Sequence, residues 1–253
     1  MANASRVLVI DDEAVVCAGI SRALLRHGYD VETERDVTLA LEKVQKNKYD
    51  VLLVDIMMPR MNGLELLARL HHEQKSARAV VITGLGAAQH AVEAFRLGAF
   101  DFITKPFTRD ELLSATMRAA TPESAQCAEL EPSPTPGTYK LGSHSWVLQV
   151  ERNVVAIGVQ ECFQRTAGKL VTVDLPNEGD DLVQGELCAR IRVEAGGVYT
   201  VWSPVSGRVV EANLALLDDP TLPNTDPYGR GWFVRLFSDS FEEECRLLDG
   251  PIS

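Results

Sequence analysis

The sequence predicts two domains: an α/β domain with a doubly wound, parallel, five-stranded sheet at residues 1–120, and a mainly β domain at residues 138–253. In the first half, apolar runs of strand length alternate with amphipathic segments of helical length, which favours a parallel sheet covered by helices. In the second half, short apolar runs follow one another with tight turns between them. A length of 253 residues also suits two hydrophobic cores better than one.

The first domain contains five apolar runs that we predict to be strands, at residues 6–10, 29–33, 50–56, 78–83 and 100–107. Three of them are almost continuously apolar, as is typical of parallel strands buried on both faces. Amphipathic stretches with helical spacing lie between and after them, for example at residues 14–28, 63–73, 87–98 and 108–120. This order predicts five consecutive βα units and an open sheet.

The segment between the domains differs from both in composition. Residues 121–137, TPESAQCAELEPSPTPG, contain four prolines and three glutamates but hardly any large apolar side chain. Such a segment cannot bury enough apolar surface to form a core. We therefore predict a linker.

The second domain is expected to be mainly β, with apolar runs at residues 145–150, 154–159, 169–175, 186–193, 197–212 and 232–237. Only residues 160–168 and 241–248 have a helical pattern. Residues 193–207, VEAGGVYTVWSPVSG, predict a hairpin whose tip holds two glycines, since glycine adopts positive φ without strain.

Charge and composition exclude several classes of function. The formal net charge of -11 divides into -1 up to Ala120 (15 basic, 16 acidic) and -10 beyond it (10 basic, 20 acidic), which argues against nucleic-acid binding. No apolar run approaches the ~20 residues that a membrane span needs, and the N-terminus has no signal-peptide pattern. The five cysteines form no CxxC pair and read as reduced thiols. We expect a cytoplasmic protein with no membrane contact.

Polar side chains fall where the apolar strands of the first domain end. Asp11 and Asp12 follow the first run, Asp55 follows VLLV within the third, Thr83 ends the fourth and Lys105 follows FDFIT within the fifth. The carboxyl ends of parallel strands share one edge of the sheet, where open α/β folds bind ligands. A single aspartate there would be an ordinary solvated strand end, but three together need a compensating cation or raised pKa values. Oxygen ligands with room for water suit Mg²⁺.

The motifs VIDDE, LLVDIMMPRMNGLELL, VVITGLG and FDFITKPF, at these spacings over residues 6–120, resemble the receiver domain of two-component response regulators. The resemblance implies a flavodoxin-like fold and makes Asp55 the phosphoacceptor. It implies that Mg²⁺ is held by Asp11, Asp12, Asp55 and the main-chain carbonyl of Met57. It also implies that Thr83 and Lys105 contact the phosphoryl group, whose donor is a phosphohistidine on a sensor histidine kinase.

The same resemblance suggests how phosphorylation is transmitted. The new charge would draw the Thr83 hydroxyl inward, and Phe102 on the fifth strand would follow; a plain core phenylalanine is the alternative for Phe102. The face made by the fourth helix, fifth strand and fifth helix would then change shape and contact a partner or a second subunit, forming a homodimer in the latter case. We expect no enzyme activity beyond the chain's own phosphotransfer and a slow autodephosphorylation.

We expect autodephosphorylation to be slow because of two side chains near the phosphoacceptor. Hydrolysis of an acyl phosphate needs a water held in line, and the residues two positions beyond Asp55 and Thr83 are placed to orient it. These are Met57 and Leu85, which hydrogen-bond weakly or not at all and crowd water out. We therefore hypothesise a long-lived phosphoryl group.

Residues 139–248 resemble the glycine cleavage system H protein, a lipoyl carrier with a hammerhead β-fold, through the ordered motifs HSW, VDLP, SPVSG, VVEAN and NTDPYGRGW. In that family the hairpin before SPVSG presents a lysine that bears the lipoyl arm. Counting back seven residues from Ser203 reaches Gly196, and the only lysines of the domain, Lys140 and Lys169, lie outside this hairpin. No lipoate is therefore expected at the usual place, while modification at either lysine stays open.

Three interpretations of the second domain follow. It is a stable β-module reused as an output or interaction surface, an unlipoylated mimic that docks on glycine cleavage or lipoate-handling enzymes as decoy or regulator, or a lipoyl carrier modified elsewhere. The interpretation that we adopt is a response regulator phosphorylated on Asp55, with a second domain that binds a protein partner rather than DNA.

Overall fold

A computed structural model describes residues 4–59, 61–73, 77–84, 88–121 and 134–251. The chain divides into two compact units, with the main boundary between residues 122 and 123. Most of the segment predicted as a linker, residues 122–133, lies outside the described residues. Its last part ends in a turn in which the backbone N–H of Thr138 donates to the carbonyl of Thr135 over 3.1 Å.

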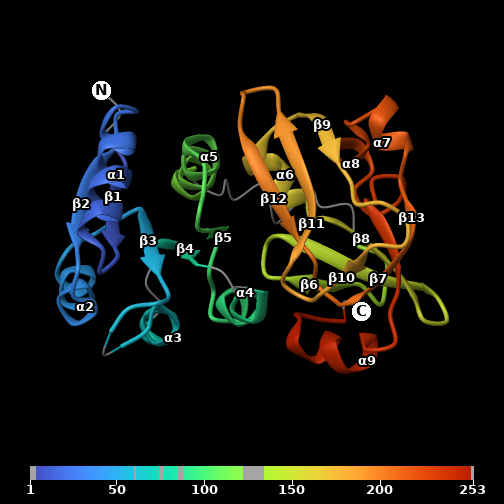
Figure 1. Cartoon of the computed structure of the whole chain (residues 1–253), viewed down its shortest axis with the longest axis horizontal. Coiled ribbons are helices and arrows are strands. Elements are labelled where there is room, and N and C mark those ends of the chain that lie inside the picture. Colours follow the sequence, from blue (N-terminus) through green and yellow to red (C-terminus); the bar gives the residue numbers. More distant parts are fainter. Residues whose placement is uncertain (1–3, 60, 74–76, 85–87, 122–133, 252–253) are drawn as a thin grey trace. The chain divides into compact units, whose positions relative to one another are not determined.

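The first unit is a five-stranded parallel sheet with strand order β2-β1-β3-β4-β5. Helices α1 and α5 cover one face of this sheet, and α2, α3 and α4 cover the other (Figure 1). This is the flavodoxin-like arrangement that the sequence predicted. The strands are β1 (Arg6–Ile10), β2 (Asp30–Glu34), β3 (Val51–Asp55), β4 (Arg78–Thr83) and β5 (Asp101–Thr104); the helices are α1 (Ala14–Leu25), α2 (Val37–Lys46), α3 (Gly63–His72), α4 (Ala88–Arg96) and α5 (Arg109–Ala120).

The central strands are buried on both faces, which explains their continuous apolar sequence. Every residue of β3 is buried, as are the last four residues of β1. The helices begin at local signals: the side chain of Asp36 accepts backbone N–H bonds at the start of α2, and that of Asn62 does so for α3. Thr108 and Glu111 form a capping box at the start of α5.

The second unit consists of two antiparallel sheets around one hydrophobic core. The larger has six strands in the order β10-β13-β14-β8-β7-β6, and the smaller has three in the order β12-β11-β9. The mainly β hammerhead prediction is confirmed. The strands are β6 (Tyr139–Leu141), β7 (Ser145–Glu151), β8 (Val154–Val159), β9 (Leu170–Asp174), β10 (Asp181–Leu182), β11 (Leu187–Val193), β12 (Val198–Trp202), β13 (Gly207–Ala212) and β14 (Val234–Phe237).

Two helices of the second unit appear at the predicted places, α6 (Glu161–Ala167) and α9 (Phe241–Glu244), the latter followed by a 3₁₀ turn, Cys245–Leu247. The expectation that only these segments are helical was wrong. The structure adds α7 (Ala215–Asp218) and α8 (Leu222–Thr225), each of four residues. A single turn is too short to show helical periodicity, and burial of Leu216 and Leu222 in the shared core holds these turns in place.

In the part of the chain that the structure describes, no helix combines the length and apolar character needed to cross a bilayer.

Candidate functional site

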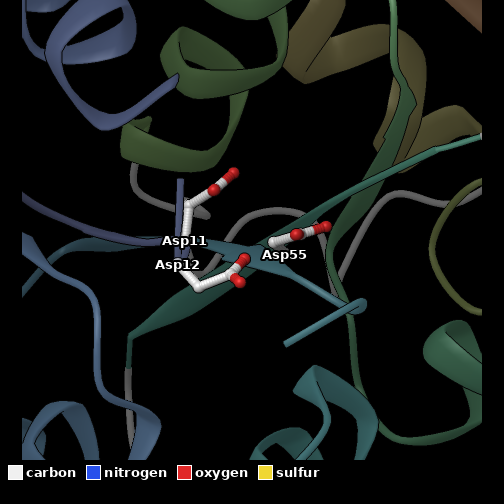
Figure 2. A group of neighbouring side chains, drawn as sticks. All are labelled: Asp11, Asp12 and Asp55. Atoms are coloured by element: carbon white, nitrogen blue, oxygen red, sulfur yellow. The ribbon is translucent and has the colours of Figure 1, made fainter. Parts of the chain in front are cut away.

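Three aspartates meet at the carboxyl edge of the first sheet. Strands β1 and β3 are neighbours, with Ile10 opposite Val54, so Asp11, which follows β1, and Asp55, the last residue of β3, lie side by side at the edge of the sheet. Figure 2 shows their side chains projecting from the ends of these strands, together with that of Asp12. One carboxylate oxygen from each of the three lies within 4.8 Å of the others. The spatial cluster expected from the strand ends is therefore present.

Lys105 reaches this cluster from the end of β5. Its Nζ lies 2.7 Å from Oδ2 of Asp11, 3.3 Å from Oδ2 of Asp55 and 3.6 Å from Oε1 of Glu13. Burial opposes the charge on the ammonium, but hydrogen bonding and attraction to Asp11 and Asp55 outweigh it and raise the pKa of Lys105. The lysine therefore stays cationic and offsets part of the negative charge at this edge.

Asp55 is the most constrained of the three carboxylates. It is 4% exposed, and its Oδ1 is buried and has no hydrogen-bond partner among the residues that the structure describes. Burial is the largest cause that raises the pKa of Asp55, and the charge of Asp11 adds to it, while Lys105 and the backbone N–H of Met57 act in the opposite direction. A buried carboxylate oxygen without a partner costs free energy unless a cation or donor reaches it.

The donor set fits a hard divalent cation. All ligand atoms are carboxylate oxygens, Asp12 is partly exposed so that water can complete the coordination, and one buried oxygen of Asp55 has no hydrogen-bond partner where the structure describes the chain. These features match the preference of Mg²⁺ for one or more carboxylates together with several retained waters.

The other predicted residues lie at or near the same edge. Thr83 ends β4 and is 2% exposed, and its carbonyl accepts the backbone N–H of Lys105 over 2.6 Å. Phe102 lies on β5 and is also 2% exposed. Met57 follows β3, and its side chain is 66% exposed. Leu85 lies outside the described residues, so its expected place beside Thr83 stays a prediction.

The sequence reasoning missed two residues that shape this site. A Cβ added to Gly63, the first residue of α3, would lie 2.2 Å from the carbonyl oxygen of Asp55, so a larger residue cannot bring α3 so close to the strand end. Glu13 precedes α1 and approaches Lys105. The role of Gly63 could have been suspected from the sequence, because it follows a turn-forming asparagine. No local pattern indicates the role of Glu13.

The hairpin of the second unit has the expected form. Strands β11 and β12 pair antiparallel, and Val193 exchanges backbone hydrogen bonds with Gly196 and Gly197 across the tip. Gly196 has φ of 85°, and a Cβ added there would meet nothing within 4 Å. Ala195 and Gly196 are both exposed. The tip projects into open space and has a backbone suited to glycine, but neither exposed residue offers an amine.

The doubly wound sheet with an acidic cluster and a lysine at its carboxyl edge defines a receiver-type domain, here joined to a β domain of hammerhead type. Comparison with known families agrees with both parts. The chain belongs to the response regulator receiver domain family through residues 7–117 and to the glycine cleavage H-protein family through residues 138–251.

Relatives of each part are known individually. The glycine cleavage system H protein of Xylella fastidiosa is 42% identical over 117 residues, which cover 46% of this chain and 88% of that protein. The H protein of Shewanella loihica is 38% identical over 107 residues, covering 42% and 82%. The crystal structure of FixJ-N is 34% identical and matches 48% of this chain and 97% of its own, with a TM-score of 0.45.

Proposed function

We propose that this chain is a response regulator whose Asp55 accepts a phosphoryl group from a sensor histidine kinase in a Mg²⁺-dependent reaction. The observation that supports this most directly is the buried Oδ1 of Asp55, which lies in a cluster of three carboxylates and finds no hydrogen-bond partner within residues 4–59, 61–73, 77–84 and 88–121. An oxygen in that state is available as a nucleophile or as a ligand. Belonging to the receiver domain family supports the same role.

The chain's own side chains suit this transfer. An oxygen of Asp55 would form a bond to phosphorus while the bond from phosphorus to the donor histidine nitrogen breaks. The other ring nitrogen of the phosphohistidine already carries a proton, so the histidine leaves as a neutral imidazole. Lys105 lies 3.3 Å from Asp55 and would neutralise charge on the phosphoryl oxygens. Bound to Asp11, Asp12, Asp55 and the main-chain carbonyl of Met57, Mg²⁺ would supply further charge neutralisation and orientation.

Thr83 and Phe102 form the proposed switch. Both are almost fully buried on adjacent strands, with β4 and β5 in register and Val81 opposite Phe102. The phosphoryl group offers new acceptor oxygens to the Thr83 hydroxyl, and movement of that hydroxyl would leave room for the Phe102 ring. The face of α4, β5 and α5 then contacts a partner or a second copy of the chain.

For the second domain we propose protein binding rather than carriage of a lipoyl group or contact with DNA. The hairpin tip has no amine on Ala195 or Gly196, so no lipoyl amide forms there. The second half has an excess of ten acidic over basic residues, which disfavours a polyanionic partner. The only chemistry of the whole chain would be its own phosphorylation and slow dephosphorylation, in the cytoplasm.

The test compares wild type with Asp55→Ala, each incubated with Mg²⁺ with and without a small-molecule phosphodonor. Intact mass spectrometry should show one phosphoryl group on wild type only, and its loss in hydroxylamine identifies an acyl phosphate. The four samples then serve as baits in a pull-down read by mass spectrometry. Phosphorylation of Asp55→Ala at the wild-type level would contradict the assignment of Asp55, and identical partners in all four samples would contradict the switch.

A further inference from the structure

Lys105 is shared by three carboxylates that differ in environment. Asp11 and Asp55 are 2% and 4% exposed, whereas the Glu13 side chain is 63% exposed. The nearest oxygen of Glu13 lies 3.6 Å from Nζ of Lys105, compared with 2.7 Å for Asp11. Glu13 is thus the outermost of the three partners of this lysine.

Under the proposed function, the two inner partners of Lys105 also serve as ligands of the divalent cation. Asp11 and Asp55 belong to the cluster that would hold Mg²⁺, yet both also contact the ammonium of Lys105. A divalent cation and an ammonium held by the same two buried carboxylates repel each other, because the surroundings screen the repulsion weakly. This repulsion favours binding of the ion when Lys105 loosens its contact with an inner carboxylate.

Glu13 is placed to receive the lysine at that moment. Its backbone N–H donates to Oδ1 of Asp11 over 2.8 Å, which holds the start of α1 against the cluster. It is the N-cap residue of α1, but its side chain makes no capping hydrogen bond, so the carboxylate is available to Lys105. A displaced ammonium can thus keep a carboxylate partner at the rim of the site.

We propose that Glu13 is a positioning residue that draws Lys105 toward the rim and so lowers the competition between this lysine and the divalent cation. This inference rests on the proposed function, because it takes the three aspartates as the ion site. The expected effect of Glu13→Gln is a lower affinity for Mg²⁺, by about three- to five-fold for a partly exposed charge pair. The substitution keeps the side-chain size and the backbone bond to Asp11.

The test separates an effect through Lys105 from a direct effect of negative charge on the ion. Mg²⁺ affinity of the full chain is measured by calorimetric titration for wild type, Glu13→Gln, Lys105→Met and the double variant. We expect Glu13→Gln to weaken binding in the wild-type background and to change nothing when Lys105 is Met. The same loss in both backgrounds, a gain in affinity, or no change in either would overturn the proposal.

Two further variants complete the experiment. Glu65→Gln removes an exposed charge in the first turn of α3 and should leave the affinity unchanged. Asp55→Asn should abolish or strongly weaken Mg²⁺ binding. If Asp55→Asn binds Mg²⁺ as wild type does, the ion site of the proposed function is wrong and the role of Glu13 falls with it. If Asp55→Asn fails to bind but Glu13→Gln behaves as wild type, only the role of Glu13 is wrong.

Discussion

Lys105 Nζ lies 3.3 Å from Oδ2 of Asp55, while Oδ1 of the same carboxylate is buried with no hydrogen-bond partner in the described part of the chain. Lys105 therefore contacts only one of the two carboxylate oxygens of Asp55. Because Asp11 takes the closer contact with Lys105, at 2.7 Å, the lysine is divided between two buried acids. The resting site keeps an excess of negative charge, which is the condition under which a further cation binds well.

The first prediction concerns stability. Asp55→Asn should raise the free energy of unfolding of the receiver domain at neutral pH without Mg²⁺ by about 1–3 kcal/mol, since it removes an incompletely compensated buried charge. Helical circular dichroism during urea unfolding follows mainly the receiver, which holds the long helices α1 to α5. The tryptophans Trp146, Trp202 and Trp232 all lie in the second domain, so their fluorescence reports on the unfolding of that domain.

The stability gain expected for Asp55→Asn depends on pH, and the sign of this dependence follows from the pKa of Asp55, which burial raises. When the pKa of a carboxyl group is higher in the folded than in the unfolded state, its ionisation destabilises the fold. This destabilisation is complete at pH values above the folded-state pKa and absent at pH values below the unfolded-state pKa. The advantage of Asp55→Asn should therefore shrink as the pH falls through this window. Saturating Mg²⁺ should also shrink it. An advantage that stays constant with pH would show that charge is not its cause.

The second prediction concerns a buried ion pair between β5 and α5. Nη2 of Arg118 lies 3.0 Å from Oδ2 of Asp101, and the guanidinium covers the ring of Phe100 with its carbon 4.4 Å from the centroid. Arg118→Met should lower the free energy of unfolding of the receiver by about 3–5 kcal/mol, because Asp101 is left buried without its cation.

Two controls accompany this measurement. Arg109→Met, on the exposed side of the same helix, should change stability by no more than about 0.5 kcal/mol. Adding Asp101→Asn to Arg118→Met should restore part of the loss, since the unpaired charge is then gone. A loss of the same size in the double variant would mean that packing of Arg118 on Phe100, not its charge, stabilises this contact.

The third prediction concerns the lifetime of the phosphoryl group. Met57 is 66% exposed next to the end of β3, and its thioether orients water poorly. Met57→Asn should shorten the half-life of phosphorylated Asp55 by about tenfold. This is the rate change expected when one added hydrogen bond to the attacking water stabilises the transition state. Loss of radiolabel from the purified phosphoprotein measures it, with Met57→Leu as the control that should match wild type. Loss from wild type within seconds would refute the expected stability.

The fourth prediction tests the hairpin tip. Ala195 is exposed next to Gly196, whose φ is 85°, so Ala195→Lys places an amine at the tip while leaving the glycine conformation intact. Co-expressed with a lipoate-attaching enzyme, Ala195→Lys should gain the mass of one lipoyl group. Wild type should not, and neither should Arg192→Lys, whose amine lies on strand β11. A lipoyl group on wild type would contradict our proposal for this domain.

Much of the receiver site could be predicted because its signals are local. A polar residue directly after a buried apolar run marks the end of a strand, and this holds for Asp11, Asp55 and Lys105. Parallel strands then bring these ends together without further information. Gly63 is only half predictable: the turn is visible in the sequence, but its close approach to the Asp55 carbonyl is not.

Contacts between distant segments were not predictable in the same way. Lys105 and Asp11 are 94 positions apart, and the place of Glu13 beside them depends on how α1 leaves the sheet. The pair formed by Asp101 and Arg118 depends on the rotation of α5 over β5. The single turns α7 and α8 form where buried leucines meet the core, not where periodicity indicates a helix.

By itself the sequence determined the two domains, the strands that end in acidic residues, and the lack of an amine at the hairpin tip, because hydrophobic pattern and residue identity are properties of short segments. Only the tertiary structure decided that Lys105 is divided among Asp11, Asp55 and Glu13 and that one oxygen of Asp55 has no hydrogen-bond partner among the described residues. The physical reason is that charge balance in a buried site depends on distances of a few ångströms, and strand register and helix packing set those distances.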